Sequence, residues 1–179
     1  DTSTALTVPT LGGRTFVKGS NFADEDTNAS FALLWNGRPL TNAVELELHT
    51  HFVIGFRIPR GVGAGHRLSL NVSGQMSTNA IRFDYAAPTL SSVSPTPLDA
   101  EGTRAFTLSG SGFGHPDDAN ASALVLAVTV GNATHNVTHN VSSLRLVGDN
   151  VVVAGEGLGA PLPEGDAKLV LTVASQRSN

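Results

Sequence analysis

The residues best suited to chemistry in this sequence are asparagines in the pattern Asn-X-Ser/Thr, which accept N-linked glycans. Six such sites occur where the Asn, Ser and Thr content predicts roughly two. Glycan attachment needs exposed asparagines in a secreted chain, so the excess indicates an extracellular or cell-surface glycoprotein. A polar β-protein that never meets the glycosylation machinery is the alternative. The six predicted acceptors are Asn28, Asn71, Asn120, Asn132, Asn136 and Asn140.

Three of these acceptors follow one another at intervals of four residues, in residues 132–140. In an extended strand Asn132, Asn136 and Asn140 share a face, about 13 Å apart at a rise of ~3.3 Å per residue. His135 and His139 then share the opposite face. This pattern favours a glycan-bearing ridge, and the alternative is a polar edge strand protected against sheet-to-sheet aggregation.

Histidines and carboxylates raise the question of a metal site. His49 and His51 alternate beside Glu45 and Glu47, a donor set suited to zinc or copper. Alignment with residues 144–150 places 49–51 over a Gly-Asp-Asn turn. We therefore expect solvated imidazoles at a hairpin tip and predict no metal site and no cofactor.

Short acidic loops are the other candidate for metal binding. They comprise residues 24–26 and 117–118, and Asp84 lies near the joint between the two halves of the chain. Calcium needs six to eight oxygen ligands, but the D-x-D-x-D-G spacing is missing. Solvated loops are the simpler interpretation.

Catalytic patterns are weak. Ser109-Gly110-Ser111-Gly112 lacks the strand-elbow-helix context of a hydrolase nucleophile, and we interpret Gly110-Ser111-Gly112 as a turn. Two converging carboxylates for sugar hydrolysis remain an alternative. Trp35 and the phenylalanines alternate as core residues do, so no sugar-stacking platform is expected. We predict that the chain is not an enzyme.

The elements that position these residues are predicted to be strands. Apolar residues recur at period two, and glycine and proline interrupt them at the spacing expected of a β-sandwich. In the first half, Val44, Leu46 and Leu48 are expected to form one apolar face of such a strand. The fold class is therefore all-β, with the turn spacing of a β-sandwich. The strands expected in the second half span residues 105–108, 124–130, 144–147, 151–153 and 169–173.

Internal repetition divides the chain. Residues 16–22 (FVKGSNF) reappear as 107–113 (TLSGSGF), and residues 68–75 (LSLNVSGQ) reappear as 169–176 (LVLTVASQ). Units of about ninety residues are large enough to hold a core. We expect one sandwich over 1–86 and a second over 87–179, with a glycosylation-rich insertion near 115–143.

Composition and net charge argue against several classes of protein. The net charge of -4 argues against nucleic acid as a partner, and no apolar run is long enough to span a bilayer. There is no cysteine, which removes disulfides and thiolate chemistry. The chain opens at Asp1 without a Met, as expected of a mature product or an excerpt of a longer chain.

The motifs resemble those of the IPT/TIG domain family, in which a Pro-led first strand precedes a Gly turn and a strand ending in G-x-G/N-F. The second unit carries them in residues 87–95, Gly102 and residues 106–114. The first unit resembles the family through residues 8–9, 12–13 and 17–22, through the apolar-x-Pro-x-Gly turn at 58–63, and through the final strand at 83–85.

The resemblance implies two tandem immunoglobulin-like β-sandwiches of the early-set type. The first hypothesis is a non-catalytic structural or adhesive segment of a secreted or cell-surface glycoprotein, such as a member of a filament or surface array. Its partners would be neighbouring domains, other surface proteins, N-linked glycans and further copies of itself. The alternative is an accessory module that binds a glycan or protein for a receptor or polysaccharide-active enzyme.

Overall fold

The computed structural model describes residues 5–24, 29–40, 46–117, 124–130, 144–148, 150–155, 157–158, 161 and 167–178. All regular structure in these ranges is β-strand, which confirms the prediction of an all-β fold. None of the described residues forms a helix long and apolar enough to cross a membrane. The chain divides into two compact units: unit 1 holds residues 1–60 and 65–84, and unit 2 holds residues 61–64 and 85–179.

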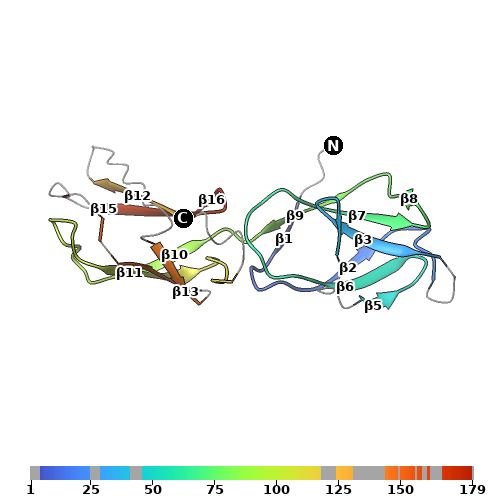
Figure 1. Cartoon of the computed structure of the whole chain (residues 1–179), viewed down its shortest axis with the longest axis horizontal. Helices are drawn as coiled ribbons and strands as arrows, with labels where there is room; N and C mark the ends of the chain where they lie inside the picture. The colour runs from blue at the N-terminus through green and yellow to red at the C-terminus, as the bar shows by residue number, and fades with distance from the viewer. Residues whose placement is uncertain are drawn as a thin grey trace. The chain divides into compact units, whose positions relative to one another are not determined.

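Unit 1 is a two-layer β-sandwich (Figure 1). One layer has the order β1 (Leu6–Val8), β9 (Ile81–Tyr85), β7 (His66–Val72), β3 (Phe31–Trp35) and β4 (Arg38–Pro39), and β8 (Gln75–Met76) also pairs with β7. The other layer has the order β2 (Gly13–Lys18), β6 (Val53–Ile58) and β5 (Leu46–His49).

Unit 2 is also a two-layer sandwich. One layer has the order β10 (Thr89–Ser94), β11 (Phe106–Ser111), β14 (Val151–Ala154) and β13 (Leu144–Val147). The other has β12 (Leu124–Val130), β15 (Ala167–Val173) and β16 (Gln176–Arg177). The five strands expected here from the sequence are present: those at 124–130 and 144–147 have the expected bounds, and the other three have shifted ends.

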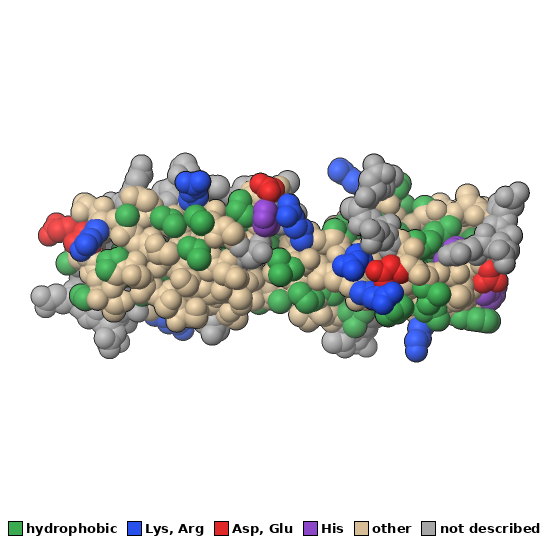
Figure 2. Space-filling model, turned by 90° about the horizontal axis from the view of Figure 1, so that it is seen from below, with side chains coloured by type: hydrophobic (Ala, Val, Ile, Leu, Met, Phe, Trp, Pro, Cys, Tyr) green, Lys and Arg blue, Asp and Glu red, His purple; other side chains and the backbone are tan. Residues whose placement is uncertain are grey.

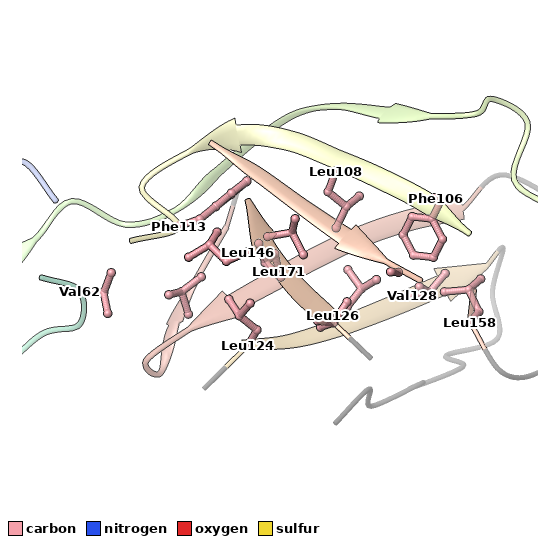
Figure 3. Close-up of a cluster of buried hydrophobic side chains, with 14 residues drawn as sticks. Val62, Phe106, Leu108, Phe113, Leu124, Leu126, Val128, Leu146, Leu158 and Leu171 are labelled. Atoms are coloured by element: carbon pink, nitrogen blue, oxygen red, sulfur yellow. The ribbon is translucent and has the colours of Figure 1, made fainter. Parts of the chain in front are cut away.

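Each sandwich buries the apolar positions of its alternating strands. In unit 1, Ile54, Phe56 and Phe83 have no exposed surface. Figure 3 shows the unit 2 core, in which side chains from both layers point into the space between them. Each fully buried side chain of this size contributes roughly 1.5–3 kcal/mol. Two such cores let the chain fold without disulfides.

The strand predicted around Val44 is present as β5, but Leu46 and Leu48, which were expected on its apolar face, are not buried. The pairing of β5 with β6 shifts between Leu46 and Leu48, and Val44 lies outside the described residues. Exposure still alternates along β5, but in the opposite sense: Leu46 and Leu48 are 40% and 39% exposed, whereas Glu47 and His49 are half-buried. The irregular pairing changes the direction of these side chains.

A two-residue turn of the same type follows β7 and β15. In unit 1, Ser73 and Gly74 have φ of 49° and 85°. In unit 2, Ala174 and Ser175 have φ of 45° and 71°. Two left-handed residues in succession match the twist of a tight hairpin, and they connect β7 to β8 and β15 to β16.

A serine closes each of these hairpins. The N–H of Leu70 donates to Ser77 Oγ at 3.2 Å, and the N–H of Leu171 donates to Ser178 Oγ at 2.9 Å. Each serine N–H returns a bond to the same leucine, at 2.8 Å and 2.7 Å. The repeated sequence therefore folds into a repeated local structure.

The repeated G-x-N/G-F element has a steric cause. A Cβ on Gly19 would lie 2.2 Å from Phe22 Cζ, and a Cβ on Gly110 would lie 2.6 Å from Phe113 Cζ. In both units the phenylalanine folds its ring back over the glycine and is buried, with 8% and 0% of its surface exposed. Glycine is required because any side chain would occupy the place of the ring.

The third residue of the element is left-handed in both units. Asn21 has φ of 63° and Gly112 has φ of 75°. This conformation costs little for glycine and asparagine and more for other residues. The chain therefore reverses at these positions and brings the phenylalanine inward.

The loop between β10 and β11 depends on Asp99. Its Oδ2 accepts bonds from the Thr103 N–H, the Thr103 hydroxyl and the Arg104 N–H, each at 3.1 Å. Partial desolvation acts to raise the pKa of Asp99, but the bonds from Arg104, Thr103 and the Glu101 backbone outweigh it. The pKa of Asp99 is therefore lower than its ordinary value.

This shift predicts a pH-dependent stability. Because the folded-state pKa is depressed, the contribution of Asp99 is present above the unfolded value of ~3.9 and is lost as the pH falls through the folded pKa. We expect the melting temperature of the wild type to fall more steeply below about pH 4 than that of Asp99→Asn. Parallel melting curves across that window would contradict the assignment.

Candidate functional site

One predicted glycan acceptor, Asn71, lies within the described residues. It sits on β7 between the inward-facing Leu70 and Val72, so its side chain projects from the outer face of the sheet, where it is half-buried. Its Oδ1 accepts a bond from the Gly74 N–H at 2.9 Å, which holds the carboxamide beside the turn. The other five acceptors lie outside the described residues: Asn28, Asn120, Asn132, Asn136 and Asn140.

The two imidazoles considered for metal binding have different surroundings. The turn between β5 and β6 is present at residues 50–52. The expectation that both rings are solvated is wrong for His49, whose Nε2 lies 2.9 Å from the Phe22 carbonyl and whose ring lies 4.3 Å from that of Phe31. The His51 ring lies edge-on to the Phe52 ring at a centroid distance of 4.9 Å, and the backbone N–H of His51 donates to Asp24 Oδ1 at 2.5 Å. These contacts stabilise the end of the sandwich.

The remaining candidate ligands also contact protein groups. Glu47 forms ion pairs with Arg14 and Arg57, and Asp84 Oδ1 accepts a bond from the Gly65 N–H at 2.7 Å. Within the described ranges, no three His, Cys, Asp or Glu side chains gather as metal ligands. Several of the residues considered lie outside those ranges: Glu25, Asp26, Glu45, Asp118, His135 and His139.

Residues 110–112 were expected to be a turn; β11 continues through Ser111, and the chain reverses only at Gly112, where φ is 75°. Ser109 pairs with Val151 of β14, and Ser111 Oγ lies 2.7 Å from Thr89 Oγ1 of β10. The strand continues because Gly110 allows the Thr89 carbonyl to approach closely. The two serines are thus part of sheet pairing.

A groove lies in unit 1. Its volume is about 480 Å³, within the range of small-ligand sites. It is bounded by the chain following β2 on one side and by β7, β8 and residues 77–81 on the other. Apolar side chains lining it include Val17, Leu70, Val72 and Ile81.

The polar lining of this groove is mostly uncharged. Hydroxyls and carboxamides surround the apolar part, and Lys18 is the one charged residue among those lining it. Such groups suit a neutral polar ligand, because they donate and accept hydrogen bonds without charge. The only aromatic lining residue is Phe22, which is 8% exposed and offers little ring surface for stacking. The polar lining residues are Lys18, Ser20, Asn21, Ser69, Gln75, Ser77, Thr78 and Asn79.

An exposed aromatic lies on the outer face of the β2–β6–β5 layer. Phe16 is 49% exposed and lies across Gly55, where a Cβ would be 2.8 Å from its Cε1. Arg14 places its guanidinium carbon 5.4 Å from the centre of the ring, within the range of a cation–π contact. We call Phe16, Leu48, Arg14, Arg57 and Glu47 the Phe16 patch.

The Phe16 patch combines apolar surface with paired charges. Arg57 Nε lies 3.2 Å from Glu47 Oε1, and Arg14 pairs with the other carboxylate oxygen. Figure 2 shows acidic and basic side chains gathered among hydrophobic ones on this side of unit 1, where Figure 1 draws β5 and β6. The expectation that all phenylalanines lie in the core is wrong for Phe16 and for Phe52, which is 60% exposed. Phe16 pairs with Gly55 across the sheet, and the prediction from the sequence missed this pairing.

Sequence comparison identifies one family. A model described as the IPT/TIG domain matches residues 88–179. No curated protein sequence matches the chain.

Several solved structures are similar to the chain. The surface glycan-binding protein PbSGBP-B from Prevotella bryantii is 14% identical with a TM-score of 0.50, covering 98% of this chain and 37% of its own. The I9–I11 tandem from titin is 11% identical with a TM-score of 0.36, covering 97% and 60%. The plexin A4 extracellular region is 12% identical with a TM-score of 0.35, covering 89% and 12%. The chain thus spans less than two thirds of each of these structures. At 14% identity the first of them bears on the fold alone.

Proposed function

The chain belongs to the IPT/TIG domain family, and on this premise we propose that it is a non-catalytic structural or adhesive segment of a secreted or cell-surface glycoprotein built from repeated immunoglobulin-like domains. The observation that carries the proposal is the repeated local structure. Both units contain the same serine-closed hairpin and the same glycine–phenylalanine corner. A module used twice in one chain is typical of spacer arrays.

The surfaces of the units support this role. The Phe16 patch offers exposed apolar area with paired charges, a composition suited to contact with another protein. The position of Asn71 on an outer sheet face is compatible with a glycan there. Glycans would keep the array soluble and set the spacing between neighbours.

The groove in unit 1 favours a second candidate function. Its uncharged polar lining would suit a neutral oligosaccharide, which would make the chain an accessory binding module. The likeness to a surface glycan-binding protein is a reason to test this, although at 14% identity it shows only the fold.

Titration of the chain with a panel of soluble neutral oligosaccharides, followed by NMR, separates the two functions. The structural role predicts no saturable shift changes up to ~1 mM ligand. Saturable shifts at the groove amides would contradict it and favour the accessory module. Asn21→Gly provides the matched control, because it removes a lining carboxamide while keeping the left-handed backbone. Binding in the groove would weaken in this variant, and binding elsewhere would not change.

A further inference from the structure

The pairing of β7 with β8 places a predicted glycan acceptor beside an exposed apolar side chain. Asn71 lies directly opposite Met76 in the register of the two strands. Cross-strand partners share a face of the sheet, so both side chains project from the outer face. The Ser77 N–H bonds to the Leu70 carbonyl at 2.8 Å. Because bonded and non-bonded pairs alternate, Asn71 and Met76 form a non-hydrogen-bonded pair, in which the side chains lie closer together.

The corresponding hairpin of unit 2 has neither member of this pair. Met76 is 52% exposed, and a single exposed apolar residue needs no explanation by itself. The register of β15 with β16 places Thr172 opposite Arg177 at the equivalent position. That pair contains no acceptor asparagine and no apolar residue. The acceptor and the exposed apolar side chain therefore occur together in one unit and are both missing from the same place in the other.

The carboxamide of Asn71 can carry a sugar without losing its present contact. Its Oδ1 accepts the bond from the Gly74 N–H at 2.9 Å, whereas a glycan is attached through Nδ2. Attachment joins Nδ2 to the anomeric carbon of a glycosyl phosphate donor, with loss of one proton from Nδ2 and departure of the phosphate. The retained bond to Gly74 would hold the first sugar beside the hairpin. Opposed Cβ atoms are about 4.5–5.5 Å apart, so this sugar can reach Met76.

We propose that a glycan on Asn71 packs the C–H face of its first sugar against Met76 and covers the thioether. The packing is favourable because it removes part of the Met76 side chain from water. This contact depends on the proposed glycoprotein role and deepens it, since it gives the glycan a fixed place on the folded surface. Held against the sheet, the glycan has a defined direction and so can set the spacing between neighbours.

Oxidation by dilute hydrogen peroxide measures how far Met76 is covered. The reaction transfers one oxygen atom to the thioether sulfur and releases water. Met76 is the only methionine of the chain, so the gain of one oxygen reports this side chain alone. The chain is secreted from a glycosylating eukaryotic host, and peptide mapping first establishes the occupancy of Asn71. The glycosylated protein should oxidise at least about threefold more slowly than its Ser73→Ala variant, because oxidation follows exposure.

Ser73→Ala is the matched variant because it removes the acceptor sequence and keeps Asn71 with its bond to Gly74. Ser73 has φ of 49°, and Ala174 occupies the equivalent place in unit 2 with φ of 45°. Alanine therefore fits this turn. When both proteins are unfolded in urea, their oxidation rates should be equal, because the contact between sugar and thioether exists only in the folded hairpin.

The outcomes separate this contact from the glycoprotein role itself. Equal oxidation rates of the two folded proteins, with Asn71 occupied, would overturn the proposal and leave that role intact. A bare Asn71 beside glycans at other acceptors would have the same consequence. Bare asparagines at all six sites would overturn both.

Discussion

Replacing Gly110 with alanine is expected to lower the free energy of unfolding of unit 2 by about 3 kcal/mol. The added Cβ would lie 1.9 Å from the Thr89 carbonyl oxygen and 2.6 Å from Phe113 Cζ. The first contact is with backbone, so relief requires β10 to separate from β11. The second displaces a fully buried ring. Urea unfolding followed by circular dichroism measures the loss.

Gly155→Ala is the matched control for this substitution. A Cβ there has no neighbour within 4 Å, and the residue follows β14 at an exposed position. The control should change the free energy of unfolding by no more than ~0.5 kcal/mol. Equal effects of the two substitutions would show that the close approach of β10 to β11 is not what requires glycine at 110.

Replacing Phe83 with alanine is expected to destabilise unit 1 by about 4 kcal/mol. The ring has no exposed surface, and β9 holds it against Trp35 at a centroid distance of 5.7 Å. Removing it leaves a cavity beneath the strand that covers this part of the core. Trp35 is the only tryptophan of the chain, so its fluorescence reports the unfolding of unit 1 specifically.

Arg82→Ala is the control on the same strand. Arg82 is exposed and points away from the core, so its replacement should leave the Trp35 transition within ~0.5 kcal/mol of the wild type. If Phe83→Ala moved that transition no more than Arg82→Ala does, the role of β9 in completing the core of unit 1 would be wrong.

Periodicity was sufficient to predict the strands because each sandwich buries one face of its strands. Leu124–Val130 and Leu144–Val147 are the clearest cases, since every second residue of the described side chains is buried. Repetition also predicted that residues 169–176 form the counterpart of 68–75. The period of two and the repeated segments both involve residues that are close together in the sequence, and both are retained in the strands of the folded sheets.

Features that depend on pairing between distant strands were not predictable. The sequence pattern predicts Phe16 in the core, because it does not show that Gly55 lies opposite Phe16 in the sheet. The sequence pattern predicts a solvated His49, because it does not show that the Phe22 carbonyl and the Phe31 ring lie beside it. The groove depends on the order of strands in a sheet, which period-two patterns do not contain.

If this chain is a structural segment of a secreted glycoprotein, its acceptor asparagines carry glycans in the native protein, and glycopeptide mapping measures this. Intact mass before and after enzymatic deglycosylation gives the total occupancy, and peptide spectra assign the sites. We expect hexose-bearing peptides at Asn71 and in the 132–140 segment, at Asn132, Asn136 and Asn140. Bare asparagines at all six sites in native material would contradict this role and would favour the accessory binding module.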